Sequence, residues 1–341
     1  MRILIVHPGP EFSVSDVYQG YATALTKIGC DVQGFNLNDR LSFYSNVSFE
    51  GAFLRPEEAI KMVNKGLLGK CYEFMPEVIV VISGFFIEGF TWDLWQYRPH
   101  AIVCIMTESP YEDDKQIALV ERAQPTITLI NDPTNLETYR EACKRVFYMP
   151  HSHDPALHYI DPVAIPKWDF GFVGTGYPSR MEFFENVDWT GLDVRFAGHW
   201  KGLAEDSELR CYLAHDIEDC YDNTDTVVLY QHCRMSANLY RASRRADLEA
   251  NSLDLAEGWS IGPREVELAA CGIPFLREPR GEGDMLFPHH PRFTEPDEFG
   301  ELLRWWLDHG DERTEIAGRA HDAVADRTFT NHARRMLALL P

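Results

Sequence analysis

Short apolar runs alternate with amphipathic, helix-like segments along most of the chain. In the first half, strand-like runs occupy residues 3–7, 31–36, 77–83, 101–107, 126–130 and 146–149. Helical patterns separate them, at residues 14–28, 55–74, 113–122 and 134–145. Continuous apolar runs of four to seven residues indicate strands that are buried on both faces, as in a parallel sheet covered by helices. The alternation therefore predicts an α/β architecture with right-handed crossovers.

The alternation is interrupted once, by four prolines between residues 150 and 166. His151, His153 and Asp154 lie in the same stretch, and a proline-rich setting favours an extended hinge over a metal site. Strand-like runs then return, at residues 170–173, 193–197, 235–239 and 273–276. Helical segments accompany them and end the chain, at residues 178–185, 224–233, 263–271, 296–309, 312–325 and 328–340. We therefore predict two doubly wound domains, residues 1–155 and 156–341, with a helical tail.

Composition limits the function classes that remain. The chain has 53 acidic and 32 basic residues among 341, a formal net charge of −21, which argues against sequence-independent nucleic-acid binding. The apolar run before His7 is too short for a secretory leader, and no run is long enough to span a membrane. The eight cysteines form no C-x-x-C pair. We therefore expect a reduced, cytoplasmic protein.

A glycine-containing loop follows the strand predicted at residues 169–173. It reads Gly174-Thr175-Gly176-Tyr177-Pro178-Ser179-Arg180. Two glycines allow a close approach of backbone to a ligand, proline fits a first helical turn, and the arginine fork suits phosphate. The alternative is a tight turn with a solvated arginine. The spacing is neither that of a dinucleotide-binding fingerprint nor that of a P-loop.

The segment from Gly258 to Pro274 carries more information. Gly262-Pro263 predicts a loop that runs into a helix, with Arg264 and Glu267 on one face of its first turns. An anion at this N-terminus would meet both the helix dipole and Arg264, and Glu267 could bind a pair of ribose hydroxyls. Gly272 would end the helix in the left-handed conformation. The alternative is an intrahelical Arg–Glu pair worth about 0.2–0.5 kcal/mol.

The stretch R-x-x-E-L-A-A-C-G-x-P-F-L, from Arg264 to Leu276, resembles the nucleotide-sugar signature of GT-B glycosyltransferases. The closest resemblance is to the bacterial spore-maturation (CgeB-like) group and to similar phage and actinobacterial enzymes. Further segments resemble that group in the same order, namely E-S-P-Y at 108–111, N-D-P at 131–133, P-H-S-H-D at 150–154, F-V-G-T-G at 172–176, A-G-H-W at 197–200 and S-A-N-L at 236–239. The match covers most of residues 100–341.

This resemblance implies a fold and an activity. In the GT-B fold, two Rossmann-like domains face each other across a cleft, and the C-terminal domain binds a nucleoside-diphosphate sugar. Uridine is the commonest base in such groups, which favours a UDP-sugar. On this chain, Glu267 would hold the ribose, and His199 and Trp200 would flank the base. The diphosphate and the rest of the donor site would be lined by Gly174, Gly176, Arg180, Asn238, Gly262 and Arg264.

Two further features follow from the resemblance. The loop at residues 281–287 would approach the donor sugar, with Glu282 as one reader of its hydroxyls; a charged surface loop is the alternative. The last helix, 328–340, would pack on the N-terminal domain.

We expect no metal ion or other cofactor to be required, because cations and a helix N-terminus can stabilise the leaving diphosphate. The chain also lacks the D-x-D motif of the metal-dependent GT-A class.

The acceptor side belongs to the N-terminal half. Candidates for a general base are Glu108, Asp16 and His7, with Asp132 beside them, all on predicted strand-to-helix loops. Their structural alternatives are a helix cap for the carboxylates and a core position for the histidine. The acceptor itself stays open among a protein side chain, a glycan and a modified DNA base. Two other functions also stay open: a nucleotide-sugar binding protein without transferase activity, and a nucleotide-sugar epimerase.

Overall fold

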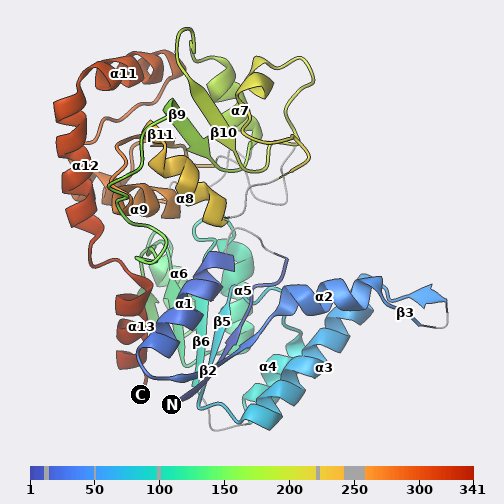
Figure 1. The fold of residues 1–341 in the computed structure, drawn as a ribbon. Helices are drawn as coiled ribbons and strands as arrows, with labels where there is room; N and C mark the ends of the chain where they lie inside the picture. Colours follow the sequence, from blue (N-terminus) through green and yellow to red (C-terminus); the bar gives the residue numbers. More distant parts are fainter. Residues whose placement is uncertain (11–14, 50, 98–100, 220–222, 242–257) are drawn as a thin grey trace. The chain divides into compact units, whose positions relative to one another are not determined.

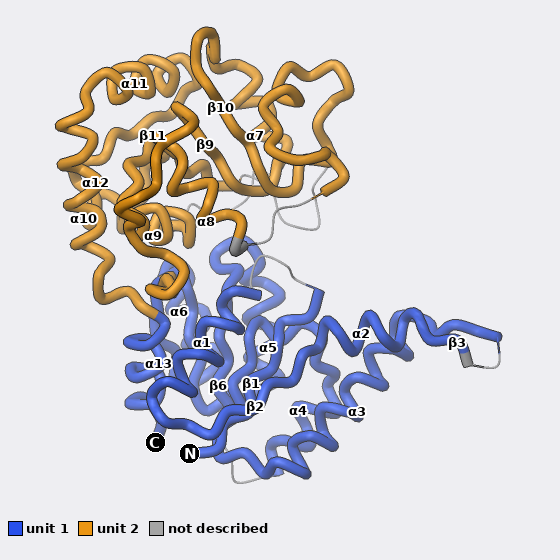
Figure 2. The backbone as a smooth tube through the Cα atoms, viewed as in Figure 1, with its two compact units in different colours: residues 1–150, 329–341 blue, residues 151–328 orange. Residues whose placement is uncertain are grey.

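The computed structural model describes residues 1–10, 15–49, 51–97, 101–219, 223–241 and 258–341 (Figure 1). The chain divides into two compact units (Figure 2). Unit 1 comprises residues 1–150 and 329–341, and unit 2 comprises residues 151–328. The division thus falls at Pro150, five residues before the expected boundary, and the end of the chain returns to unit 1.

Unit 1 is built on a six-stranded parallel sheet with the order β2-β1-β5-β6-β7-β8. The strands are β1 (Arg2–Val6), β2 (Asp31–Phe35), β5 (Val78–Ile82), β6 (Ala101–Met106), β7 (Ile127–Ile130) and β8 (Val146–Tyr148). All five residues of β5 are buried, because helices cover both faces of the sheet. The strand order reverses direction between β1 and β5, which makes this the topological switch point of the sheet.

The helices of unit 1 form two layers. They are α1 (Ser15–Lys27), α2 (Leu37–Asn46), α3 (Pro56–Phe74), α4 (Gly89–Trp95), α5 (Asp113–Ala123), α6 (Leu136–Ala142) and α13 (Phe329–Ala338). Alternate residues of β1 belong to separate core clusters: Leu4 packs with α3, α4 and α5, and Ile5 packs with α1 and α13. The C-terminal helix α13 lies against α1, where the ring of Phe329 packs directly on Gly20.

Unit 2 is built on a four-stranded parallel sheet with the order β10-β9-β11-β12. Its strands are β9 (Trp168–Val173), β10 (Val194–Ala197), β11 (Cys233–Asn238) and β12 (Phe275–Arg277). Its helices are α7 (Pro178–Glu185), a 3₁₀ turn (Glu208–Tyr212), α8 (Asn223–Gln231), α9 (Pro263–Ala270), α10 (Gly281–Leu286), α11 (Pro296–Asp308) and α12 (Gly310–Val324). The strand order reverses between β9 and β11.

An aromatic cluster fills one face of the second sheet. Phe172 of β9 and Phe184 of α7 have ring centroids 4.9 Å apart, and Phe196 and Trp200 are 5.2 Å apart. All four side chains are fully buried. Rings of this size bury large apolar areas and prefer tilted or edge-to-face contacts, so the cluster gives the loops that follow β9 and β10 a rigid base.

Three local predictions are corrected or completed by the structure. Residues 281–286, expected as a loop that approaches the donor sugar, form α10; there Asp284 pairs with Arg277 at 2.6 Å and Glu282 pairs with Arg327 at 2.7 Å. Helix α2 and the short hairpin of β3 (Ser48–Phe49) and β4 (Ala52–Phe53) were not predicted. Residues 150–167 contain no helix or strand beyond an isolated bridge, as expected of a proline-rich linker.

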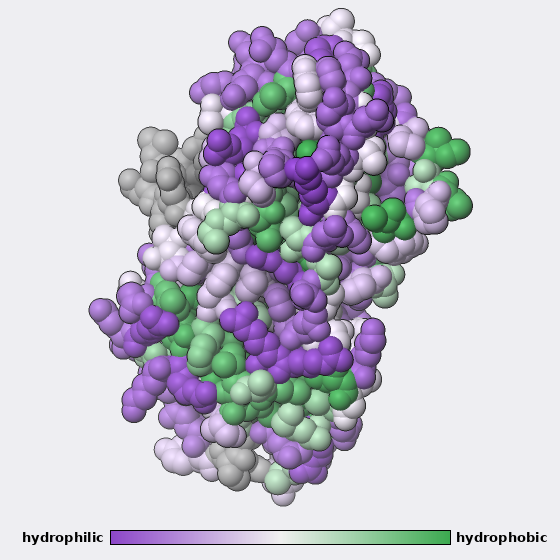
Figure 3. Space-filling view, turned by 90° about the vertical axis from the view of Figure 1, so that its left-hand side faces the viewer, coloured by the Kyte–Doolittle hydropathy of each residue, from purple (hydrophilic) through white to green (hydrophobic). Residues whose placement is uncertain are grey.

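Many of the hydrophilic side chains lie on the surface of the protein. Hydrophilic side chains make up most of the face drawn in Figure 3, with apolar patches between them. Over the described ranges, no helix combines the length and the apolar character that crossing a bilayer requires.

Candidate functional site

The carboxyl ends of β9 and β11 and the first turn of α9 converge in unit 2. Strands β9 and β11 pair in parallel, so the loop that begins at Gly174 and the end of β11 at Asn238 lie at one edge of the sheet. The guanidinium of Arg264, in α9, reaches both: Nη1 donates to Asn238 Oδ1 at 2.6 Å, and a Cβ on Gly174 would lie 2.3 Å from Nη2. In doubly wound sheets this edge, at the switch point, is where ligands bind.

Helix α9 begins as its sequence predicts. Gly262 is the N-cap in an extended conformation, and Pro263 occupies the first turn. The side chain of Glu265, at the third position, accepts the Gly262 N–H at 2.8 Å. Gly272 follows the helix with φ +67°. The positive end of the helix dipole therefore points to the edge where β9 and β11 end.

Arg264 is a half-buried cation with neutral partners. In the described part of the chain, its side-chain partners are Asn238, the Tyr230 hydroxyl and the Phe172 ring, whose centroid lies 4.6 Å from Cζ. Its Nε is buried and finds no acceptor among the described residues. Among the described residues no carboxylate forms an ion pair with this guanidinium, so at a helix N-terminus it can present its positive charge to an anion.

Glu267 lies one turn farther along α9 and is half-buried. Its Oε2 lies 3.5 Å from the hydroxyl of Tyr230. Arg264 and Glu267 are both described, and no ion pair joins them, so the alternative of a self-contained Arg–Glu pair does not hold. Tyr230, from α8, lies beside both side chains, and burial raises its pKa well above the usual value.

Glu265 belongs to the same site, although its role was not predicted from the sequence. It is fully buried, and its Oε2 accepts hydrogen bonds from Asn238 Nδ2 at 2.8 Å and from the Tyr240 hydroxyl at 2.6 Å, besides the Gly262 N–H. Burial raises its pKa to about 7, and these hydrogen bonds act against that rise. The sequence signal was its position, since a glutamate at the third residue of a helix commonly caps the N-terminus.

Two predicted donor residues hold the loops rather than presenting a surface. Arg180 is buried and donates to the carbonyls of Thr175 at 3.0 Å and Leu239 at 2.5 Å, so it ties together the loops after β9 and β11. Trp200 is fully buried, and its indole N–H donates to the Ala197 carbonyl at 3.0 Å. The expectation that Trp200 flanks the base does not hold in this conformation, because no part of its ring is exposed.

Glu282 is likewise a structural carboxylate. It is buried, accepts the Ile261 N–H at 2.9 Å and pairs with Arg327. Its expected contact with the donor sugar is therefore replaced by a bond that holds the segment before α9. Gly176 packs on the Trp200 ring, and His199 remains half-buried in the loop after β10, where its carbonyl accepts the Gly176 N–H.

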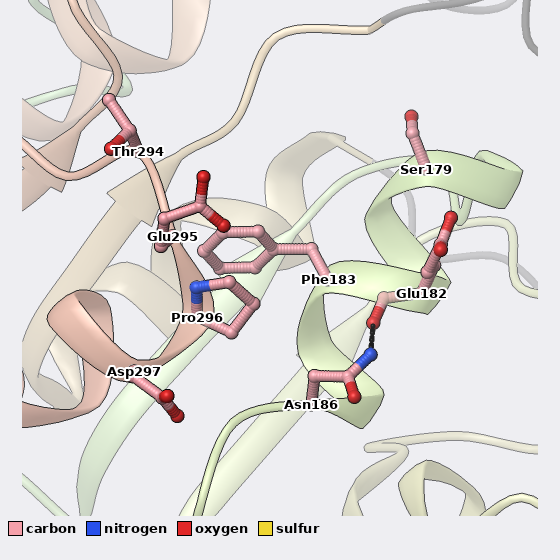
Figure 4. A pocket seen from close by; sticks show the side chains of 8 residues that line it. All are labelled: Ser179, Glu182, Phe183, Asn186, Thr294, Glu295, Pro296 and Asp297. Carbon is pink, nitrogen blue, oxygen red and sulfur yellow. Dashed lines mark hydrogen bonds between the residues drawn. The ribbon is translucent and has the colours of Figure 1, made fainter.

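A hollow elsewhere in unit 2 is lined by other residues. Figure 4 shows it between α7 and the start of α11. Its lining residues are Ser179, Glu182, Phe183, Asn186, Thr294, Glu295, Pro296 and Asp297. None of the predicted donor residues lines it, and its acidic side chains do not favour an anionic ligand.

The candidate bases of unit 1 follow β1 and β6 or begin α1. His7 is buried after β1: Nδ1 accepts the Gly9 N–H at 3.1 Å, and Nε2 lies 3.4 Å from Ser15 Oγ. Burial lowers its pKa, and nearby Asp39 acts in the opposite direction. Asp16 lies in the first turn of α1, and Glu108 is buried just after β6.

The loop that carries Glu108 is fixed by a buried polar network. Asp113, in the first turn of α5, is buried and accepts hydrogen bonds from Ser109 at 2.5 Å and Tyr139 at 2.7 Å. Asp132, after β7, accepts the Thr134 N–H at 2.8 Å in a local turn. Polar side chains therefore gather at the carboxyl ends of β6 and β7.

Known proteins share both the sequence pattern and the fold. The family model described as glycosyl transferase-like matches residues 166–340, just over half of the chain. Sucrose-phosphate synthase from Thermosynechococcus elongatus is similar over 99% of this chain and 98% of its own, with 13% identity and a TM-score of 0.68. HepE from Anabaena in complex with UDP is similar over 100% and 99%, with 11% identity and a TM-score of 0.64.

A third structure, of the E. coli trehalose-6-phosphate protein bound with UDP-2-fluoro glucose, is similar over 100% of this chain and 99% of its own. Its identity is 10% and its TM-score 0.61. A search of curated protein sequences gave no match. The two parallel α/β units agree with the GT-B fold predicted from the sequence. The chain belongs to the glycosyl transferase-like family and is a glycosyltransferase of the GT-B fold.

Proposed function

We propose that this enzyme transfers a sugar from a UDP-sugar without the help of a metal ion, and that unit 2 binds the donor. The observation that carries the proposal is the state of Arg264, a half-buried cation at the first turn of α9 whose side-chain partners among the described residues are all neutral. The leaving diphosphate gains negative charge in the transition state. Fixed cations and helix N–H groups stabilise that state more than the ground state.

The other proposed contacts to the donor come from residues near the same edge of the sheet. Glu267 can accept two hydroxyl hydrogen bonds from the ribose, because its carboxylate is half-exposed and contacts only the Tyr230 hydroxyl in the described part of the chain. Gly174 and Gly176 allow the backbone of their loop to approach the diphosphate. His199, half-exposed in the neighbouring loop, is the remaining candidate beside the base.

Uridine is the first nucleotide to test. HepE was solved with UDP and with UDP-glucose, and the E. coli trehalose-6-phosphate protein with UDP-2-fluoro glucose. The motif around Arg264 supports a place near the CgeB-like group. For the acceptor side we retain His7, Asp16 and Glu108 as candidate bases, and a protein, a glycan or a modified DNA base as acceptor.

Calorimetric titration tests the donor proposal. UDP-glucose should bind with the same dissociation constant in EDTA and in Mg²⁺, and more tightly than GDP-glucose or dTDP-glucose. Arg264→Gln should weaken binding by about tenfold to a hundredfold, the value of one or more charge-assisted hydrogen bonds. Arg319→Gln on α12, which removes an exposed cation paired with Glu315, serves as the charge-matched control.

Two results would contradict the proposal: no binding of any nucleotide sugar, or an Arg264→Gln variant that binds as tightly as the wild type. Slow release of UDP from UDP-glucose separates a transferase from a binding protein, because a transferase hydrolyses its donor at a low rate when no acceptor is present. Recovery of an isomerised nucleotide sugar would instead indicate an epimerase.

A further inference from the structure

Glu265 is an unusual carboxyl group for a donor site. It is fully buried next to Arg264, and its two oxygens have different surroundings. Oε2 accepts three hydrogen bonds, whereas Oε1 is buried and finds no donor among the residues that the structure describes. A buried acceptor without a donor is costly, and more so when the group is charged. A proton on Oε1 neutralises the carboxylate and so removes the part of that cost that comes from burying a charge.

Asn238 connects this carboxyl group to Arg264. Its Nδ2 donates to Glu265 Oε2 at 2.8 Å, and its Oδ1 accepts from Arg264 Nη1 at 2.6 Å. The opposite orientation of the amide would bring its NH₂ group against the guanidinium, where two donors would face each other. Glu265 therefore fixes which end of Asn238 faces Arg264, and through it the position of the guanidinium.

We infer that Glu265 is a positioning residue for donor binding, which holds Arg264 through Asn238 and takes up one proton when the donor diphosphate binds. The inference rests on the proposed function, because it assumes that the diphosphate binds beside Arg264. The proton comes from solvent and adds to Oε1, converting the carboxylate to a neutral acid. No bond of the donor forms or breaks in this step.

Burial and the polar and charged groups around Glu265 determine the pH range in which it takes up a proton. The groups that face it are the Tyr240 hydroxyl, the Asn238 amide, the Gly262 N–H and the Arg277 guanidinium. All four favour the ionised form, but burial outweighs them and raises the pKa to about 7. The negative charge of a diphosphate nearby shifts the balance further toward the protonated form.

Titration calorimetry with UDP-glucose, in buffers of different ionisation enthalpy, measures the proton uptake. UDP-glucose is the probe because its diphosphate does not change charge near neutral pH. The uptake should be about half a proton at pH 7, close to one at pH 8 and near zero at pH 5.5. Above pH 7 the dissociation constant should rise by up to about tenfold per pH unit.

Two substitutions of Glu265 separate positioning from general stability. Glutamine has the shape of the protonated acid, so Glu265→Gln should bind UDP-glucose at pH 8 about as tightly as the wild type does at pH 6, without the proton uptake. Glu265→Ala should bind weakly at every pH, because nothing then fixes the Asn238 amide. A purely structural role would give both variants the same pH dependence as the wild type.

Tyr240→Phe provides an independent test if the Glu265 variants fail to fold. It removes a hydroxyl that favours the ionised carboxylate, so the fall in affinity should move to higher pH. The inference is overturned if wild-type UDP-glucose binding releases the same heat in all buffers, if Glu265→Gln keeps the wild-type pH dependence, or if Tyr240→Phe leaves that dependence in place. Absence of UDP-glucose binding at every pH would instead contradict the proposed function.

Discussion

Gly174→Ala should impair donor binding while leaving the fold nearly intact. The new methyl group would lie 2.3 Å from Arg264 Nη2 and 3.2 Å from Cζ. Ordinary contact begins near 3.4 Å, so Nη2 must move by about 1.1 Å. A comparable displacement of Nη1 would stretch its 2.6 Å bond to Asn238 beyond hydrogen-bond range. The flexible end of an arginine can make this shift, so the cost falls on the site.

The magnitude follows from the bonds that are lost. A hydrogen bond to a charged group contributes about 1.5–3 kcal/mol, so the dissociation constant for UDP-glucose should rise by about tenfold to a hundredfold. Calorimetric titration measures the affinity, and thermal unfolding should show a melting temperature within a few degrees of the wild type. A Gly174→Ala protein that binds UDP-glucose normally would refute the placement of the diphosphate at Arg264.

Three further predictions concern the elements that support the site. Gly198→Ala should lower the melting temperature markedly, because its methyl would lie 2.3 Å from the Gly174 carbonyl oxygen at a φ of +111°; an unchanged melting temperature would contradict the geometry. Glu282→Gln should destabilise the protein by about 3 kcal/mol in urea unfolding, because it leaves the Arg327 charge poorly compensated, yet keep UDP-glucose affinity; lost affinity in a stable protein would contradict its structural role. Burial lowers the pKa of His290 to about 3, so the unfolded chain binds its proton first and stability falls, by up to about 1.4 kcal/mol per pH unit, as pH decreases below about 6.5. His290→Gln should reduce the stability difference between pH 7 and pH 5, and an unchanged difference would show that His290 is not the cause.

The fold was predictable where the sequence pattern and the burial agree. The run at Val78–Ile82 is apolar throughout because both faces of β5 are covered, and such runs identified most strands of both sheets. Helix α2 was missed because only Leu37 among its residues is fully buried; Leu41 and Tyr44, on the same face, are partly exposed, which leaves its apolar stripe short. Helix α10 was missed because the charges of Asp284 and Glu282 are compensated by Arg277 and Arg327. These two arginines lie outside the helix, so the spacing of charged residues within it does not reveal them.

For the candidate site, the sequence predicted the local backbone better than the side-chain contacts. The spacing from Gly262 to Glu267 indicated a helix start with a cation and an acid on one face, and the structure has that arrangement. The burial of Trp200 depends on the aromatic cluster beneath the loop, which no local pattern reports. Glu265 was overlooked because its hydrogen-bond partners are distant in the sequence: Asn238 ends β11 and Tyr240 follows that strand.

In the proposed donor site, Arg264 binds the diphosphate of the nucleotide and Glu267 binds its ribose. Comparing UDP with 2′-deoxy-UDP in wild type and Glu267→Ala tests it directly, with the exposed Glu301→Ala of α11 as control. The wild type and the control should prefer UDP by about tenfold or more, whereas Glu267→Ala should bind both ligands equally and more weakly. If Glu267→Ala still discriminates between the two nucleotides as strongly as the wild type does, the ribose lies elsewhere and the account is wrong.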